Sequence, residues 1–203
     1  DRLLTSLKGK YGPQSLSGTV HPEGTGILLH GVPGTGKTEF ARYLAESLDR
    51  ELIIKRSSDI LSKWVGDNEQ NIRNAFAEAE TENAVLCIDE ADSFFRNRES
   101  SGSSWEVSFT NELLTQMENF SGVFVCSTNL IDILDPAVMR RFAWKVQFRP
   151  LRKEHRAEIV RAYFELPKLS EEEHASFADI HDLTPGDVKA VWLKYGTTPT
   201  LSP

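Results

Sequence analysis

Residues 31–38 read Gly-Val-Pro-Gly-Thr-Gly-Lys-Thr, and residues 85–90 read Val-Leu-Cys-Ile-Asp-Glu. The first stretch has the form GxxxxGK[ST], in which backbone N–H groups of a glycine-rich loop and of the following helix N-terminus surround phosphates. The second stretch is an apolar strand that ends in two carboxylates. Together they predict a magnesium–nucleotide site with a hydrolytic base beside it.

The flanking sequence supplies the context that the phosphate loop needs. Residues 26–30 read as a buried strand entering the loop, and residues 37–49 read as a helix leaving it. Lys37 is expected to reach the β- and γ-phosphates, and the Thr38 hydroxyl to bind Mg²⁺. The nucleotide-binding set is Gly31, Val32, Pro33, Gly34, Thr35, Gly36, Lys37 and Thr38, and the buried face of the helix is Phe40, Ala41, Leu44 and Leu48.

The acidic pair stands where ligands bind in parallel sheets. Residues 84–88 are continuously apolar, as in a central strand buried on both faces. Asp89 and Glu90 then follow at its carboxyl end. Asp89 is predicted to share the Mg²⁺ with Thr38, and Glu90 to act as the general base that polarises the attacking water.

Composition bounds the class of protein. The chain has 203 residues, of which 39% are hydrophobic and 26% charged, with a net charge of −7. These values predict a globular protein and argue against a nucleic-acid partner. No apolar run approaches the roughly 20 residues of a membrane span, and Cys87 and Cys126 are expected to be reduced core residues, so we expect a cytoplasmic location. Because the chain begins at Asp1, we expect a processed or excised piece of a longer protein.

The remaining patterns predict an α/β fold with a parallel five-stranded sheet flanked by helices. Further strands are expected at residues 52–54, 123–127 and 144–148, helices at 2–9, 67–80 and 107–117, and a mobile loop at 97–104. Beyond Pro150 only helical patterns occur, at 152–165, 170–179 and 185–195. We therefore predict a nucleotide-binding subdomain over residues 1–150 and a small, abbreviated helical subdomain over 151–203.

Two further stretches carry a resemblance to a known family. Residues 127–130 (Ser-Thr-Asn-Leu) and 134–142 (Leu-Asp-Pro-Ala-Val-Met-Arg-Arg-Phe) resemble the second region of homology of AAA+ ATPases, and residues 58–76 resemble the pore-loop segment of the AAA family proper. The katanin, spastin and ESCRT-disassembly branch is the most similar by eye, and a bacterial relative would read equally well. The resemblance implies a P-loop core with a helical lid, ATP as the nucleotide and Mg²⁺ as the metal.

The resemblance also implies residue roles. Asn129 matches the sensor that positions the attacking water beside the γ-phosphate. Arg141, and second Arg140, match arginine fingers that enter the site of a neighbouring subunit. Many members carry another arginine at the position that Trp144 occupies here, so a second finger is either Arg140 or absent. Alone, such an arginine pair would be read as a solvated helix end.

A substrate-binding loop is implied by Lys63, Trp64, Val65 and Gly66, which have the aromatic–aliphatic–glycine pattern of loops that grip a polypeptide in a central channel. A large flat side chain suits a grip that does not read sequence. Residues 100–105 align with a second such loop but lack its usual basic residues. Tyr163 falls where relatives often place a ring near the adenine, with core packing as an equal alternative. Gly186 belongs to residues 184–187, which fall on the sensor-2 region of the lid, where several branches carry an arginine that this chain lacks.

The resulting hypothesis is an ATP-driven protein remodeller or translocase. It would work as a homo-oligomeric ring, expected to be a hexamer, on a protein substrate and with an adaptor in some settings. Two alternatives stay open: a DNA-acting loader or initiator, and a nucleotide-switched assembly scaffold. The acidic charge disfavours the first, and Glu90 with Asn129 disfavours the second, because a pure switch needs no well-placed base.

Overall fold

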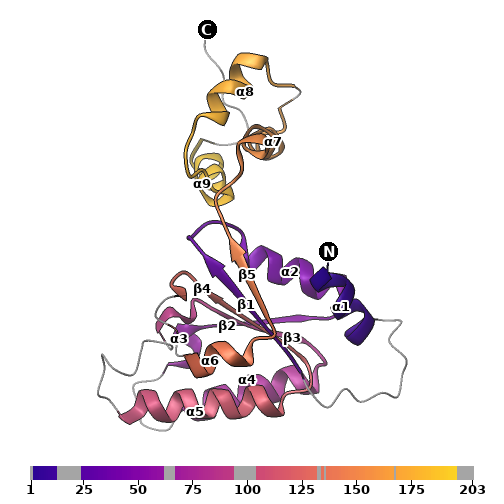
Figure 1. The fold of residues 1–203 in the computed structure, drawn as a ribbon, viewed down its shortest axis with the longest axis vertical. Coiled ribbons are helices and arrows are strands. Elements are labelled where there is room, and N and C mark those ends of the chain that lie inside the picture. The colour runs from indigo at the N-terminus through magenta and orange to yellow at the C-terminus, as the bar shows by residue number, and fades with distance from the viewer. Residues whose placement is uncertain are drawn as a thin grey trace. The chain divides into compact units, whose positions relative to one another are not determined.

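The computed structural model of the protein describes residues 2–12, 24–61, 67–93, 104–131, 134, 136–166 and 168–195. The chain forms two compact units. The first consists of Asp1–Gly31 and Lys37–Gln147, and the second of Val32–Gly36 and Phe148–Pro203. Figure 1 shows the course of the chain with its elements labelled.

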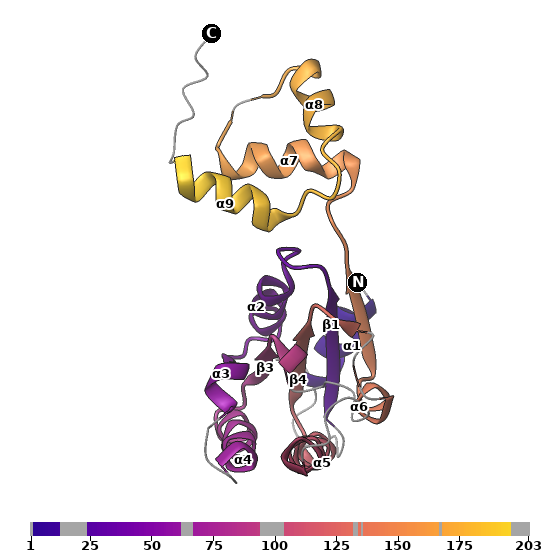
Figure 2. The same cartoon turned by 90° about the vertical axis from the view of Figure 1, so that its left-hand side faces the viewer.

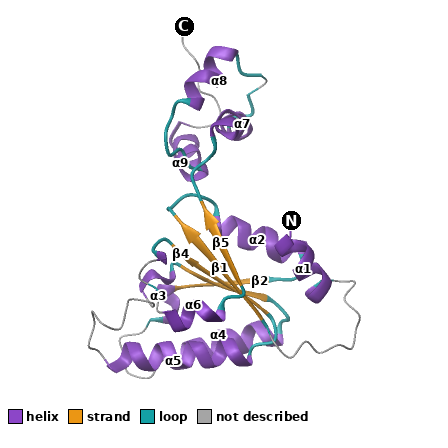
Figure 3. Ribbon diagram, in the orientation of Figure 1, coloured by secondary structure: helices purple, strands orange, loops and turns teal. Residues whose placement is uncertain are grey.

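The first unit is built on one sheet. Its strands lie in the order β2-β3-β4-β1-β5 and are drawn in orange in Figure 3. The β2–β3, β3–β4 and β4–β1 pairs are parallel, so consecutive strands must be joined by crossovers. The order places the strands that precede the phosphate loop and the acidic pair on either side of β4. The bounds are β1 Thr25–Gly31, β2 Leu52–Arg56, β3 Val85–Asp89, β4 Val123–Thr128 and β5 Trp144–Phe148.

Helices cover the sheet. Helices α1 and α2 pack together, as do α4 and α5, and Figures 1 and 2 show α4 and α5 running side by side. The helices of this unit are α1 Arg2–Tyr11, α2 Lys37–Ser47, α3 Ser57–Ile60, α4 Asp67–Thr81, α5 Ser104–Asn119 and α6 Pro136–Arg141, with a 3₁₀ turn, η1, at Ala91–Ser93.

A core cluster joins one face of the sheet to α4, α5 and α6. Phe124 of β4 packs against Phe76 of α4 at a ring-centroid distance of 5.2 Å and stacks on Phe142 at 5.9 Å. Phe120 meets Phe76 edge to face, also at 5.2 Å. These rings are almost fully buried, so they fix the ends of α5 and α6 against the sheet.

The predicted elements are confirmed with shifted ends. All five strands are present, α4 buries Ile72, Phe76 and Ala79 as expected, and α2 ends at Ser47 rather than residue 49. Of the buried face predicted for α2, Phe40 is only half-buried. Helix α5 begins at Ser104, the last residue of the loop predicted at 97–104, and it is longer than the helix predicted at 107–117. Residues 97–103 lie outside the described residues.

Both cysteines are free and buried, as predicted for core residues. They come from neighbouring strands, and Cys87 opposes Val125 while Cys126 opposes Ile88 in the register. Burial raises the pKa of the Cys87 thiol to about 12 and that of Cys126 well above its ordinary value.

The second unit is helical beyond β5. It contains α7 Lys153–Tyr163, α8 Glu171–Ala178 and α9 Pro185–Tyr195, with α7 packed against both α8 and α9. Ser170 caps α8 through a reciprocal pair of hydrogen bonds with Glu173. Over the described part of the chain, no helix combines the length and apolar character needed to cross a bilayer.

Candidate functional site

The phosphate loop follows β1 directly and has the backbone geometry that its glycines permit. Gly34 and Gly36 have φ angles of 76° and 93°, in the region that favours glycine. The Thr35 hydroxyl donates to the carbonyl of Val32 at 2.8 Å, which ties the two ends of the turn together. The loop therefore curves back on itself before α2 begins.

Within the second unit, the loop segment approaches the start of α9. The N–H of Gly186 donates to the carbonyl of Gly34 at 2.8 Å. A Cβ atom added at Gly186 would lie 2.7 Å from the Gly34 Cα, so this approach needs glycine. Thr184 caps α9, since its hydroxyl oxygen accepts from the N–H of Asp187 at 3.2 Å and the Asp187 carboxylate accepts in return from the N–H of Thr184 at 2.9 Å.

Lys37 opens α2 and points its amine back to the loop. The Nζ atom donates to the carbonyl of Gly31 and to Oδ1 of Asn129, both at 2.8 Å. Burial lowers the pKa of the Lys37 amine, while the charges of Asp89 and Asp92 raise it. The Lys37 ammonium group thus donates to two protein oxygens that a phosphate oxygen could replace.

Thr38 and Asp89 meet at the carboxyl end of β3. The Thr38 hydroxyl donates to Oδ2 of Asp89 at 2.8 Å, and the Ser127 hydroxyl donates to Oδ1 of the same carboxylate. Mg²⁺ commonly takes one or two protein oxygens and completes its shell with substrate phosphates and water. A hydroxyl and a carboxylate held side by side next to a phosphate loop fit that ion.

Glu90 follows Asp89 and is exposed, with a left-handed φ of 58° that is uncommon for its residue type. Its backbone is held on both sides. Ser57 donates to its carbonyl at 2.5 Å, and its N–H lies 3.1 Å from Asp89 Oδ1 and 3.3 Å from the Ser127 hydroxyl. A strained backbone conformation that neighbouring hydrogen bonds hold in place is typical of functional positions.

Asn129 lies just beyond β4, as the sequence predicted, and contacts one residue that sequence reasoning missed. Asp92, in η1, accepts hydrogen bonds from the backbone and the side-chain amide of Asn129. The signal available in the sequence was its place two residues after Glu90. Because β3 and β4 are neighbours, that spacing brings η1 to the end of β4.

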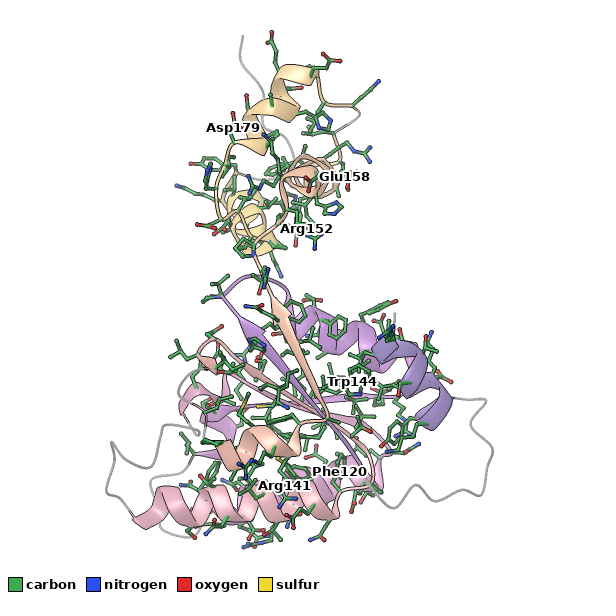
Figure 4. The ribbon with its side chains drawn as sticks, in the orientation of Figure 1. Phe120, Arg141, Trp144, Arg152, Glu158 and Asp179 are labelled. Carbon is green, nitrogen blue, oxygen red and sulfur yellow. The ribbon has the colours of Figure 1, made fainter. Side chains whose placement is uncertain are left out.

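The arginines are placed differently. Arg141 is the last residue of α6, and its guanidinium pairs with Glu118 of α5; Figure 4 shows Arg141 beside α5. Arg140 is exposed on the same helix. The structure therefore joins Lys37, Thr38, Asp89 and Asn129 through hydrogen bonds, whereas Arg141 has an acidic partner of its own.

Of the other predicted site residues, Tyr163 lies in the described part of the chain and the first substrate-binding loop does not. Tyr163 is the half-buried last residue of α7, so adenine contact and core packing both stay open as predictions. Lys63, Trp64, Val65 and Gly66 lie outside the described residues, as does most of the second predicted loop at 100–105.

Comparisons with known proteins agree with this geometry. Residues 27–150 match the family model described as "ATPase family associated with various cellular activities (AAA)". The chain is 40% identical over 153 residues to the 26S proteasome regulatory subunit 8 homolog of Schizosaccharomyces pombe, a match that covers 70% of the chain and 38% of that protein. It is 34% identical over 173 residues to the cell division cycle protein 48 homolog of Archaeoglobus fulgidus, with 81% and 23% covered.

A third relative is Protein SAV of Sulfolobus acidocaldarius, which is 38% identical over 146 residues, with 68% of the chain and 19% of that protein covered. The chain thus spans between about a fifth and two fifths of the length of these relatives.

Proposed function

Because the chain belongs to the AAA family of ATPases, we propose that it binds ATP at the phosphate loop and hydrolyses it with Glu90 as general base. The observation that carries this proposal is the pair of hydrogen bonds that link the start of α2 to the ends of two strands. Thr38 reaches Asp89 after β3, and Lys37 reaches Asn129 after β4, each at 2.8 Å. These two bonds support a single site formed by the start of α2 and the ends of β3 and β4.

The chemistry follows from the residues. The loop N–H groups and the Lys37 ammonium bind the phosphates, and Mg²⁺ held by Thr38 and Asp89 would neutralise charge on them. Glu90 accepts the proton of the attacking water, and the Asn129 amide orients that water. The exposure of Glu90 supports this role, since the base must be reachable by solvent.

We propose that the helices after β5 form the lid of the site. In this proposal the nucleotide-binding subdomain comprises residues 1–150 and the lid comprises residues 151–203. The 2.8 Å hydrogen bond from Gly186 to Gly34 within the second unit supports a place for the start of α9 at the phosphate loop. Tyr163 is proposed to lie at the adenine.

We further propose that the site is completed by a second copy of the chain in a ring, expected to be a hexamer, with Arg141 as the finger and Arg140 in second place. The finger sequence and a half-exposed guanidinium on α6 support this arrangement. Work on protein substrates through a pore lined by Lys63, Trp64, Val65 and Gly66 is supported by the family and by the kinds of relatives named above.

The ring is tested by the specific ATPase activity measured over a wide range of protein concentration, with native mass determined in parallel. A shared site predicts that activity per subunit rises together with the oligomeric mass. Activity that is constant while the protein remains a monomer would contradict the shared site and leave a self-contained P-loop ATPase.

The pore is tested with Trp64→Ala. This change is expected to spare ATP hydrolysis and to abolish ATP-dependent unfolding of an unstructured-tailed fluorescent protein. Equal unfolding rates for the variant and the parent would contradict a grip by Trp64.

A further inference from the structure

Asp92 receives an unusual number of hydrogen bonds from one short stretch of chain. Its Oδ1 atom accepts from the Thr128 hydroxyl, from the N–H of Asn129 at 2.8 Å and from the N–H of Leu130 at 3.3 Å. Its Oδ2 atom accepts from Nδ2 of Asn129 at 3.1 Å. One carboxylate thus holds the whole turn that follows β4.

The backbone that carries Asp92 is itself fixed. The preceding residue, Ala91, is fully buried in the core cluster beneath α4 and α5. Glu90, one residue earlier, is held by Ser57 and Ser127. The carboxylate of Asp92 is therefore presented from an anchored turn, and its side chain is half-buried.

This contact decides which way the Asn129 amide points. A side-chain amide has a donor end and an acceptor end, a carboxylate only accepts, and an ammonium only donates. Asn129 lies between the Asp92 carboxylate, at 3.1 Å from Nδ2, and the Lys37 ammonium, at 2.8 Å from Oδ1. Turning the amide over would set oxygen against carboxylate and NH₂ against ammonium, so only one orientation satisfies both neighbours.

We propose that Asp92 is a positioning residue that locks the amide of Asn129 with its oxygen toward Lys37 and the reacting phosphate. The inference rests on the role proposed above for Asn129, and it assigns to Asp92 no contact with the nucleotide. All of its described hydrogen bonds run to the turn that presents Asn129, so its directional contacts act through that residue, while its charge also raises the pKa of the Lys37 amine.

The test variant is Asp92→Asn, which keeps the size of the side chain. The new carbonyl oxygen can still accept the three bonds at Oδ1, whereas the new NH₂ group faces Nδ2 of Asn129, donor against donor. Residues that orient metal ligands are typically worth about 10- to 100-fold in activity, and by analogy kcat is expected to fall by about that factor when Asn129 is no longer oriented. The KM for ATP should stay within about twofold, since no ground-state contact to ATP is removed. A raised KM for ATP together with an unchanged kcat would overturn the proposal.

A double-mutant cycle separates positioning from general damage. If Asp92 acts only through Asn129, then Asp92→Asn combined with Asn129→Ala should lose no more kcat than Asn129→Ala alone. Losses that multiply would overturn the inference. The matched control is Asp179→Asn, an exposed acid of the second unit that pairs with Lys153 at 3.7 Å, and it should leave kcat unchanged.

A readout that needs no turnover is the side-chain amide signal of Asn129 in the ¹⁵N NMR spectrum of the nucleotide-free chain, identified by its loss in Asn129→Ala. The signal should shift in Asp92→Asn and stay in place in Asp179→Asn. An unmoved signal in Asp92→Asn would overturn the inference. If instead Asn129→Ala retains full kcat, Asn129 does not orient the attacking water, and the positioning role of Asp92 is contradicted as well. An impaired Asn129→Ala beside an unimpaired Asp92→Asn would sink the positioning role alone.

Discussion

Replacing Arg141 with alanine should separate stability from activity. The Arg141 guanidinium pairs with Glu118, and the two side chains are 47% and 46% exposed. Exposed ion pairs contribute about 0–1 kcal/mol, which in a chain of this length corresponds to a fall of the melting temperature by at most about 4 °C. An arginine that acts on the transferring phosphate is worth about 10³–10⁵ in kcat.

The assay is phosphate release at saturating ATP, with thermal melting in parallel. The matched control is Arg73→Ala, because Arg73 forms another ion pair with α5, to Glu112 at 3.1 Å, in which the two side chains are 42% and 20% exposed. It should show a similar small loss of stability with activity retained. If Arg141→Ala loses no more activity than Arg73→Ala, the finger assignment is refuted.

Mixing provides a sharper version of the experiment. A finger that acts in trans and a base that acts in cis lie on different subunits of the same site. Equal parts of Arg141→Ala and Glu90→Gln chains should therefore recover activity that neither has alone, because some interfaces combine an intact base with an intact finger. A mixture no more active than the average of its two components would contradict a finger that acts in trans.

Three further predictions concern the scaffold. Phe76→Ala removes a ring that packs on two others at 5.2 Å, and it should lower the free energy of unfolding by about 3–5 kcal/mol, measured by urea titration. The pKa of Cys87 is about 12 in the fold, so that thiol stays protonated above pH 9, where it ionises in the unfolded chain. Stability should consequently fall as pH rises from about 9 to 12, and less so in Cys87→Ser. Gly26→Ala would set a Cβ 3.0 Å from the carbonyl of Arg141 and 3.3 Å from the Phe142 ring, so a drop in melting temperature is expected, whereas Gly9→Ala, which meets nothing within 4 Å, should be neutral or stabilising.

The core of the site was predictable because its parts are contiguous in the sequence. The apolar run that ends at Gly31 predicts a buried strand followed by the phosphate loop. The apolar run that ends at Asp89 predicts a buried strand followed by the acidic pair. The motif around Asn129 added the third part. The ends of the long helix α4 were also predicted within one residue, whereas α5 begins three residues before and ends two residues after its predicted bounds.

What sequence reasoning missed lies in short elements and long-range pairs. Helix α3 has four residues and α6 has six, too few for a helical period to show. The order of the strands was not predicted, although it is what places Asp92 against Asn129, 37 positions later. Likewise nothing local links Arg141 with Glu118, since that contact depends on how α6 docks on α5.

The proposed role of Glu90 as the base of an ATP-hydrolysing site is tested by comparing ATP binding with phosphate release in Glu90→Gln. The glutamine amide keeps the size of the side chain. It also leaves in place the hydrogen bonds of the residue-90 backbone with Ser57 and Asp89, which do not involve the carboxylate of Glu90 itself. We predict ATP affinity equal to that of the parent and phosphate release reduced to background. Release that proceeds at the parental rate in this variant would contradict this role.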